Sequence, residues 1–287
     1  PSFEKGGVEK IIINLIDYFS KKNINIYLIT TKNDNLKLLK QKNINLICSS
    51  KNYFNFLSSR FSTSLSCIFP LINLLKTLNN KNTIIHSMQS SYLPIIFSKF
   101  KKFKIVIRNS EDPIASIKYA DNFLTSYIVF ILRFFFYNFA DKIITNSKGS
   151  AKSMKLFMFG KNKNKIQYIY NPYLTLDKIK ASKKKKLKKN IILSVGRLCK
   201  QKNFEDLIIA FSNFNKKNNK YILKIIGQGS YKQKLSDLIR SKKMEKKIFL
   251  KGYLDNLDEE YKKSKLFILP SLYEGLGNVL IEALNFS

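Results

Sequence analysis

The segment SLYEGLGNVLIEAL, residues 271–284, sets two acidic residues and two glycines into an otherwise apolar pattern. Glu274 comes directly before the glycines, and Glu282 lies eight positions later, inside the apolar run. The preceding LFILPS predicts a buried strand, Gly275–Gly277 a turn, and Asn278 the N-cap of a helix. Carboxylates accept hydrogen bonds and sugar hydroxyls donate them in pairs, so the two acids can hold a sugar and a ribose on either side of a diphosphate.

The predicted helix start is also a candidate anion site. Backbone N–H groups of Gly277, Asn278 and Val279 would point out of the positive end of the helix, where a phosphate binds well. Glycines at a turn let such a group approach the backbone closely. The alternative interpretation is a surface turn with Glu282 favourably placed near a helix N-terminus, and the spacing alone leaves both open.

Two cations and a glycine pair occur at comparable places. Arg197 and Lys202 stand in SVGRLCKQKN, after a predicted strand and before a helix, where arginine offers a planar fork and lysine a point charge to phosphate oxygens. Their alternative is a pair of solvated loop charges. Gly6 and Gly7, in EKGGVEK, would allow close approach at the start of the first helix, although a lone Gly-Gly is weak evidence because turns often use it.

The elements that must position these residues alternate regularly along the chain. Strands are expected at 23–31, 43–49, 82–88, 103–109, 141–147 and 165–172, and then at 190–197, 221–227, 247–252 and 266–271. Strands rich in β-branched residues that alternate with helices predict parallel sheets covered on both faces. We therefore expect an α/β protein with two Rossmann-like domains facing across a cleft. In such sheets ligands bind at the carboxyl ends of the strands.

The expected organisation is an N-terminal domain over residues 1–179, a basic linker over 180–189 and a C-terminal domain over 190–287. The second domain shows four strands where a full Rossmann-like sheet has about six. The chain starts at Pro1 in what resembles a turn entering a helix, and it stops at Ser287 inside a helical pattern. We expect a fragment that lacks a first strand and a C-terminal segment, so an inactive remnant of an enzyme is one hypothesis.

The charge of the chain has two interpretations. Fifty-two Lys and Arg against 19 acidic residues give a net charge of +33. Such an excess is typical of proteins that bind nucleic acid or an anionic membrane, and also of lysine-rich solvated faces. The densest run, KASKKKKLKKN, has no interleaved aromatic residues for base stacking, which favours a linker. A nucleic-acid-binding protein stays the alternative to an enzyme.

Cysteine, histidine and hydropathy narrow the possibilities further. Cys48, Cys67 and Cys199 fall at no metal-ligand spacing, and His86 is the single histidine, which argues against a histidine-rich metal site and for reduced thiols in the cytoplasm. The apolar run FLTSYIVFILRFFFYNFA, 123–140, is short for a membrane span and carries Arg133 near its middle. It predicts a buried helix or one that lies against a membrane.

Taken in order, these segments resemble the retaining family-4 glycosyltransferases of the GT-B fold. SVGRLCKQKNFEDLIIAF is similar to the family's donor-diphosphate strand and helix, and LPSLYEGLGNVLIEAL to its E-x7-E element. GGVEK, ADKIITNSKGS and YIYNP resemble its landmarks in the first domain. The resemblance covers nearly the whole chain and is strongest from 191 to 284.

The resemblance implies roles for these positions. Arg197 and Lys202 would bind the diphosphate of a nucleotide-sugar donor, Glu274 would contact the donor sugar, and Glu282 would hold the ribose. The donor would also meet the backbone of Gly275, Leu276, Gly277, Asn278 and Val279, and the loop of Gly6 and Gly7. A hexose or N-acetylhexosamine, expected to come from a UDP-sugar, would pass to a glycan acceptor with retention of configuration. No cofactor and no metal would be needed, and no nucleic-acid partner is expected.

The chain departs from the family at one place. Many members carry a histidine after the strand that corresponds to FKIVIRNSEDP, whereas here the candidates for sugar or acceptor contacts are Arg108, Asn109, Ser110 and Glu111. His86 follows a different strand, as a structural or cleft-lining residue. This region is similar to bacterial N-acetylgalactosaminyltransferases that act on lipid-linked glycans. We therefore expect a lipid-linked or polysaccharide acceptor and a cytoplasmic enzyme, peripheral at the inner face of the cytoplasmic membrane.

Overall fold

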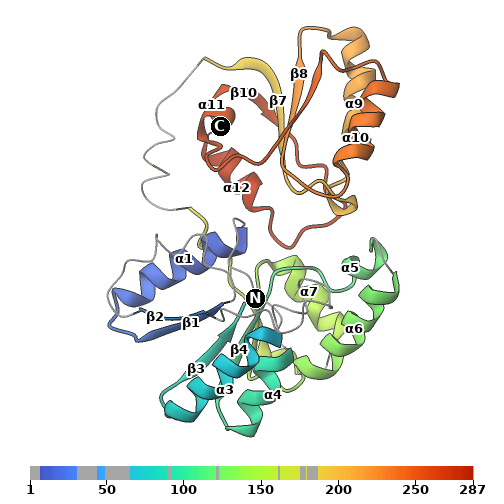
Figure 1. Cartoon of the computed structure of the whole chain (residues 1–287). Helices are drawn as coiled ribbons and strands as arrows, with labels where there is room; N and C mark the ends of the chain where they lie inside the picture. The colour runs from blue at the N-terminus through green and yellow to red at the C-terminus, as the bar shows by residue number, and fades with distance from the viewer. Residues whose placement is uncertain are drawn as a thin grey trace. The chain divides into compact units, whose positions relative to one another are not determined.

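The chain forms two compact units with parallel sheets (Figure 1). The computed structural model describes residues 7–30, 44–48, 65–88, 92–120, 123–160, 162–174, 179 and 187–286. Unit 1 comprises Pro1–Ile114 and Leu124–Tyr173, and unit 2 comprises Ala115–Phe123 and Leu174–Ser287. The expected α/β class with two Rossmann-like sheets is confirmed, and the short segment Ala115–Phe123 groups with the second unit.

Unit 1 contains all six strands expected from its sequence. They are β1 (Ile26–Thr30), β2 (Ile44–Cys48), β3 (Ile84–Ser87), β4 (Lys104–Asn109), β5 (Lys142–Thr145) and β6 (Ile166–Tyr168). β1 pairs with β2, and β3, β4, β5 and β6 pair in that order, every pair being parallel. The helices are α1 (Gly7–Ser20), α3 (Ile68–Thr77), α4 (Tyr92–Phe100), α6 (Phe123–Tyr137) and α7 (Lys148–Phe157), with a short 3-10 turn at Lys163–Lys165.

The core of unit 1 lies between the larger sheet and its helices. Ile105 and Ile107 of β4 are fully buried, and they pack in one cluster with Met154 and Phe157 of α7. Helix α7 starts cleanly because the side chain of Ser147 accepts a hydrogen bond from the backbone N–H of Ser150 at 3.0 Å, which is a typical N-cap. Met154 and Phe157 of α7 thus face the core, whereas its lysines are exposed.

Unit 2 contains the four strands expected from the sequence. They are β7 (Lys189–Val195), β8 (Ile222–Ile226), β9 (Ile248–Lys251) and β10 (Ser264–Phe267), in the parallel order β10-β7-β8-β9. The helices are α5 (Ala115–Lys118), α9 (Phe204–Lys217), α10 (Lys232–Ser241), α11 (Asp258–Lys263) and α12 (Asn278–Asn285), with a 3-10 turn at Lys200–Lys202. Ile192 of β7 packs in a cluster with α9 and α10 residues, and Leu193 packs with Tyr261 and Phe286. Both faces of this sheet are thus covered, as a parallel sheet requires.

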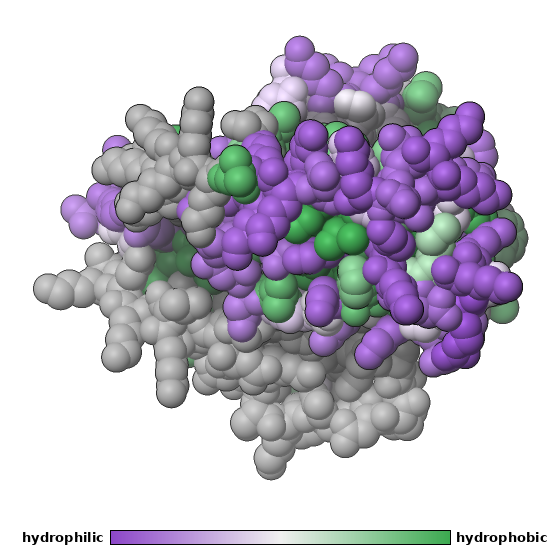
Figure 2. Space-filling model, turned by 90° about the horizontal axis from the view of Figure 1, so that it is seen from above, coloured by the Kyte–Doolittle hydropathy of each residue, from purple (hydrophilic) through white to green (hydrophobic). Residues whose placement is uncertain are grey.

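The surface agrees with the charge of the chain. On the face shown in Figure 2, the coloured residues are mostly hydrophilic, and hydrophobic residues form small groups among them. Cys67 and Cys199 are free thiols. Within the part of the chain that the structure describes, no helix reaches the length and apolar character needed to cross a membrane.

Candidate functional site

The expected donor residues of the second half all follow strands of the unit 2 sheet. Because β7, β8, β9 and β10 are parallel, their carboxyl ends share one edge. The loop after β7 carries Arg197 and Lys202, and the loop after β10 carries Glu274 and leads into α12 with Glu282. The sheet therefore delivers the predicted cations and acids to one edge of one unit.

The loops after β7 and β8 approach each other so closely that only glycine fits. A Cβ atom on Gly227 would lie 1.9 Å from the carbonyl oxygen of Gly196, and Gly227 has φ +154°. A Cβ atom on Gly229 would lie 2.2 Å from the carbonyl oxygen of Leu198. The Leu198 N–H donates to the Gln228 carbonyl at 2.9 Å, and the Tyr231 N–H donates to the Leu198 carbonyl at 2.9 Å. The sequence showed GQGS after a strand but not this crossing of two loops.

Gln201 ties the loop after β7 to the loop after β10. Its backbone carbonyl accepts from the Leu272 N–H at 2.9 Å, and its side-chain amide donates to the Tyr273 carbonyl at 3.1 Å. Next to this bridge, the Lys202 ammonium pairs with the Glu274 carboxylate, and the two side chains are only 13% and 23% exposed. The cation and the acid expected at different parts of a ligand are therefore in direct contact. Sequence reasoning did not find the role of Gln201.

Arg197 differs from Lys202 in its surroundings. Residue Arg197 is exposed, and its guanidinium donates to the Gln201 side chain over a long 3.4 Å contact. The stem of Lys202 instead lies over Gly196, where an added Cβ atom would be 3.3 Å from Lys202 Cδ. At this edge Arg197 is thus the accessible cation, and Lys202 is the partly enclosed one.

The start of α12 corrects one expectation. Asn278 is the first residue of the helix, and Gly277, with φ −73° and ψ 85°, occupies the N-cap position without a side-chain hydrogen bond. The prediction of Asn278 as N-cap is therefore wrong by one residue. An added Cβ on Gly277 would lie 2.7 Å from Leu269 Cδ2, so the chain enters the helix through a residue that leaves room for Leu269. Gly275, Leu276 and Val279 lie at intermediate exposure around this turn.

Glu282 is buried, so the two acids predicted to hold a sugar and a ribose differ in their access to solvent. The residue is 2% exposed, whereas the Glu274 side chain is 23% exposed. The hydroxyl of Tyr261, on α11, donates to Glu282 Oε2 at 3.1 Å. Glu282 lies one turn into α12, on the side that packs over the sheet, which explains its burial. Tyr261 was missed because nothing in DEEYKK distinguishes it from an ordinary helix residue.

Several polar residues gather at the carboxyl ends of β4 and β5 of unit 1. Arg108 is 4% exposed, and its guanidinium donates to the Ile169 carbonyl at 2.9 Å and to Asn171 Oδ1 at 2.7 Å. Burial lowers the pKa of Arg108. Among the described residues, Arg108 Nε and Asn146 Oδ1 are buried without a hydrogen-bond partner. Most buried polar atoms in proteins have a hydrogen-bond partner. These two atoms have none, so a polar group of a bound ligand could supply it.

The other candidates of unit 1 lie around this cluster. The Asn109 side chain donates to the Glu111 carbonyl, and the Ser110 carbonyl accepts from Asn146 Nδ2 at 3.1 Å. Glu111 is exposed. The pKa of His86, on β3, is lowered to about 4, first by loss of solvent around the ring and second by the charge of Arg108. Because the residue keeps an exposed face, solvent still reaches part of it.

Two expectations about ligands keep the status of predictions. Gly7 opens α1, whereas Gly6 lies outside the described residues, so the structure does not locate the Gly-Gly loop. In the described ranges no group of three or more His, Cys, Asp or Glu side chains could hold a metal ion. The roles of the candidate residues and the independence from metal are taken up as proposals below.

Comparison with known proteins shows which family the chain belongs to. Residues 5–173 match the family Glycosyltransferase Family 4, and residues 176–287 match Glycosyl transferases group 1. An uncharacterized glycosyltransferase of Methanocaldococcus jannaschii is 31% identical over 213 residues, which are 69% of this chain and 51% of the relative. The N-acetylgalactosamine-N,N'-diacetylbacillosaminyl-diphospho-undecaprenol 4-alpha-N-acetylgalactosaminyltransferase of Campylobacter jejuni is 34% identical over 197 residues, which are 68% of this chain and 52% of the relative.

Solved structures show the same architecture. The Anabaena protein HepE in complex with UDP-glucose aligns with a TM-score of 0.68 at 14% identity, over 99% of this chain and 76% of that one. WaaG, a glycosyltransferase involved in lipopolysaccharide biosynthesis, aligns with a TM-score of 0.67 at 15% identity, over 99% and 77%. The fold is thus that of the GT-B glycosyltransferases. The chain belongs to Glycosyltransferase Family 4. It spans about half the length of the curated relatives it matches.

Proposed function

We propose that this glycosyltransferase moves a hexose or N-acetylhexosamine from a UDP-sugar to a glycan acceptor carried on a lipid, with retention of configuration. One observation carries the proposal: Arg197 and the paired Lys202 and Glu274 lie at the carboxyl edge of one parallel sheet, where Gln201 contacts Arg197 and links the two loops that carry them. The donor is suggested by structural neighbours solved with UDP or UDP-glucose. The acceptor class is suggested by the Campylobacter relative, whose name specifies a diphospho-undecaprenol-linked glycan.

The proposed mechanism starts from the ion pair. Without donor, Lys202 is neutralised by Glu274. A diphosphate that reaches the edge first meets the exposed guanidinium of Arg197 and then competes with Glu274 for Lys202. Once Lys202 turns to the phosphate, the Glu274 carboxylate is released to accept hydrogen bonds from sugar hydroxyls. Both cations then stabilise the negative charge that develops on the leaving nucleotide as the glycosidic bond breaks.

Glu282 has a different role in this proposal. Tyr261 holds one of its oxygens at 3.1 Å, and burial in α12 restricts its motion. In this proposal the held carboxylate binds the ribose hydroxyls of the donor. Because Arg197, Lys202 and a helix start supply the positive charge, we propose that transfer needs no metal and continues in the presence of a chelator.

A thermal-shift series with UDP-, GDP- and ADP-sugars tests the donor. A ligand at a hundred times its dissociation constant stabilises a protein by about 2.7 kcal/mol, so the correct nucleotide stands out clearly. Arg197→Ala should weaken that stabilisation, whereas Arg240→Ala, a control on α10 with a 71% exposed side chain, should not. Transfer of the sugar to a lipid-linked acceptor should likewise be weakened by Arg197→Ala and unaffected by Arg240→Ala. Equal donor binding by the parent and Arg197→Ala rules the proposal out.

A further inference from the structure

Arg108 is a buried cation of unit 1 for which the described chain supplies no opposite charge. The residue is only 4% exposed at the carboxyl end of β4, and the ion pairs found among the described residues do not include it. Burial lowers the pKa of its guanidinium, as expected of a cation without an acid beside it. A buried charge is costly unless an opposite charge compensates it. The fold therefore encloses a cation at this edge of the sheet without neutralising it.

Arg133 of α6 shows the difference that anionic neighbours make. Burial by itself lowers the pKa of its guanidinium, but Tyr137, Tyr92 and Glu111 outweigh burial and raise that pKa. The guanidinium also lies 6.0 Å from the centroid of the Tyr137 ring, within reach of a cation–π interaction. The pKa values of the two arginines therefore change in opposite directions, and Arg108 is the one of the two whose charge is left uncompensated.

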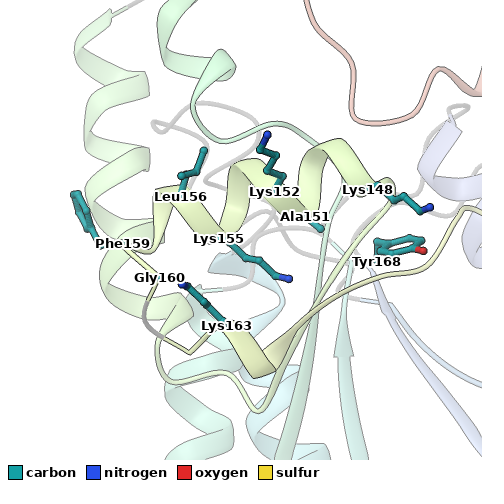
Figure 3. Close-up of a pocket in the computed structure, with 9 residues that line it drawn as sticks. All are labelled: Lys148, Ala151, Lys152, Lys155, Leu156, Phe159, Gly160, Lys163 and Tyr168. Carbon is teal, nitrogen blue, oxygen red and sulfur yellow. The ribbon is translucent and has the colours of Figure 1, made fainter.

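The lysines on and just after α7 form a cationic surface of a different kind. Four of them line a groove of about 670 Å³ (Figure 3), and all four are exposed: Lys148, Lys152, Lys155 and Lys163. Water solvates exposed ammonium groups, so these charges need no partner within the protein or from a ligand. Arg108 is cut off from water and does need one. The groove is therefore a suitable control for positive charge in the same unit.

The hydrogen bonds of Arg108 leave part of its guanidinium unused. Nη2 donates to the Ile169 carbonyl at 2.9 Å and to Asn171 Oδ1 at 2.7 Å, which ties down the chain after β6. Nε is buried and has no hydrogen-bond partner within the described residues. A structural tie of this kind requires donors but no charge. It therefore explains neither the positive charge of Arg108 nor the unpaired Nε–H.

Asn146 has a second unsatisfied atom at the same edge of the sheet. β4 and β5 pair with Arg108 opposite Ile144, and Asn146 follows Ile144 by two positions. Asn146 Nδ2 donates to the Ser110 carbonyl at 3.1 Å, whereas its Oδ1 is buried without a partner in the described chain. The edge thus presents an unpaired donor on a cation and an unpaired acceptor on an amide. A ligand that satisfies both atoms carries an oxyanion and a hydroxyl group.

We infer that Arg108 anchors a site in unit 1 for an oxyanion of the glycan acceptor, with Asn146 Oδ1 accepting a hydrogen bond from a hydroxyl of the same molecule. The inference rests on the proposed function, because it takes the bound molecule to be the acceptor. A guanidinium binds phosphate and carboxylate oxygens equally well by charge-assisted hydrogen bonds. The oxyanion therefore comes either from the diphosphate of a lipid-linked glycan or from a uronic acid within the glycan. A neutral acceptor leaves Arg108 uncompensated and binds more weakly.

Equilibrium titrations with three small probes test the inference. N-acetylglucosamine 1-phosphate carries a phosphate, the methyl glycoside of glucuronic acid carries a carboxylate, and the methyl glycoside of N-acetylglucosamine is neutral. UDP is present at saturating concentration throughout, so that Arg197 and Lys202 do not bind the probes. An anionic probe should bind about 10-fold or more tightly than the neutral one, because a hydrogen bond to a charged group is strong. The anionic probe that binds more tightly of the two identifies the source of the oxyanion.

Matched variants show which cation is responsible. Arg108→Gln should remove the preference, with a loss of about 10- to 100-fold in affinity for the anionic probe. Arg133→Gln, which removes the compensated arginine, should keep it, and so should the triple change Lys148→Gln, Lys152→Gln and Lys155→Gln in the groove. Equal binding of the three probes by the unmodified protein overturns the inference. A preference that is lost with the groove lysines but kept in Arg108→Gln overturns it as well.

Asn171→Asp tests the missing charge without removing Arg108. The new carboxylate takes the place of the Asn171 amide oxygen that accepts from Nη2. Because it supplies the opposite charge, we expect a higher melting temperature of unit 1 and a loss of anionic probe binding as large as in Arg108→Gln. Unchanged probe binding in Asn171→Asp overturns the inference, even where Arg108→Gln fails to fold. Thermal stabilisation by UDP-sugar separates the two proposals: its presence with equal probe binding refutes only the oxyanion site, whereas its absence in the unmodified protein refutes the proposed donor.

Discussion

The hydrogen bond between Tyr261 and Glu282 gives a sharp prediction about stability. Tyr261→Phe removes only the hydroxyl, because the ring contacts are kept: the stack on Phe286, with centroids 5.7 Å apart, and the tilted contact with Phe267 at 5.7 Å. The hydroxyl also lies 3.3 Å from the Val279 carbonyl, and Glu282 is 2% exposed, so water replaces the lost hydroxyl poorly. A hydrogen bond to a charged group contributes about 1.5–3 kcal/mol, and we expect unit 2 to lose about 2 kcal/mol.

The assay must follow unit 2 itself. The chain contains no tryptophan, so amide hydrogen exchange of β7 and β8 is more specific than intrinsic fluorescence. Tyr221→Phe is the matched control, because its ring packs at 5.5 Å on Phe214 and its hydroxyl forms no hydrogen bond among the described residues. A double-mutant cycle of Tyr261→Phe with Glu282→Met should give a coupling energy of about 1–2 kcal/mol. Unchanged exchange in Tyr261→Phe, or zero coupling, would refute the assigned partnership.

Two further predictions concern the backbone and pH. Gly227→Ala should prevent folding of unit 2 or lower its free energy of unfolding by more than about 3 kcal/mol, because a Cβ would lie 1.9 Å from the Gly196 carbonyl oxygen. Hydrogen exchange measures the loss, and a variant as stable as the unmodified protein contradicts this prediction. The pKa of His86 is lowered from 6.5 to about 4 in the folded chain. As the pH falls, the unfolded chain therefore binds a proton at His86 at a higher pH than the folded chain does. Stability should therefore fall as the pH drops from 6.5 towards 4, and His86→Gln should flatten that part of the urea-denaturation profile. An unchanged slope in the variant shows that other groups cause it.

The order of elements was readable from the sequence for a physical reason. Buried parallel strands need continuous β-branched runs, so segments such as NIILSV and KIVIRN stand out against the helices between them. Loops follow the strands, and the carboxyl ends of parallel strands share one edge, so the position of Arg197, Lys202 and Glu274 at that edge could also be predicted. Their spacing along the chain does not, however, encode which of them pair with one another.

The contacts that sequence reasoning missed depend on packing between distant segments. Tyr261 and Glu282 are 21 positions apart and meet only because α11 and α12 cover the same face of the sheet. Burial of Glu282 follows from the same packing, and periodicity within α12 alone does not reveal it. The wrong N-cap prediction at Asn278 also comes from packing. Gly277 takes the N-cap position, where a side chain would collide with Leu269, and residue preferences alone do not show that collision.

The crossing of the loops after β7 and β8 has a consequence for recognition. Leu198 is tied on both its N–H and its carbonyl, and two glycines lie against the neighbouring loop with no space for a side chain. These loops consequently lost most of their conformational freedom when the unit folded. A ligand that binds to these loops contacts a preorganised surface, so little binding free energy is spent on ordering the backbone. In the proposed function, the steps left for binding are the ordering of the exposed guanidinium of Arg197 and the exchange of partners at Lys202.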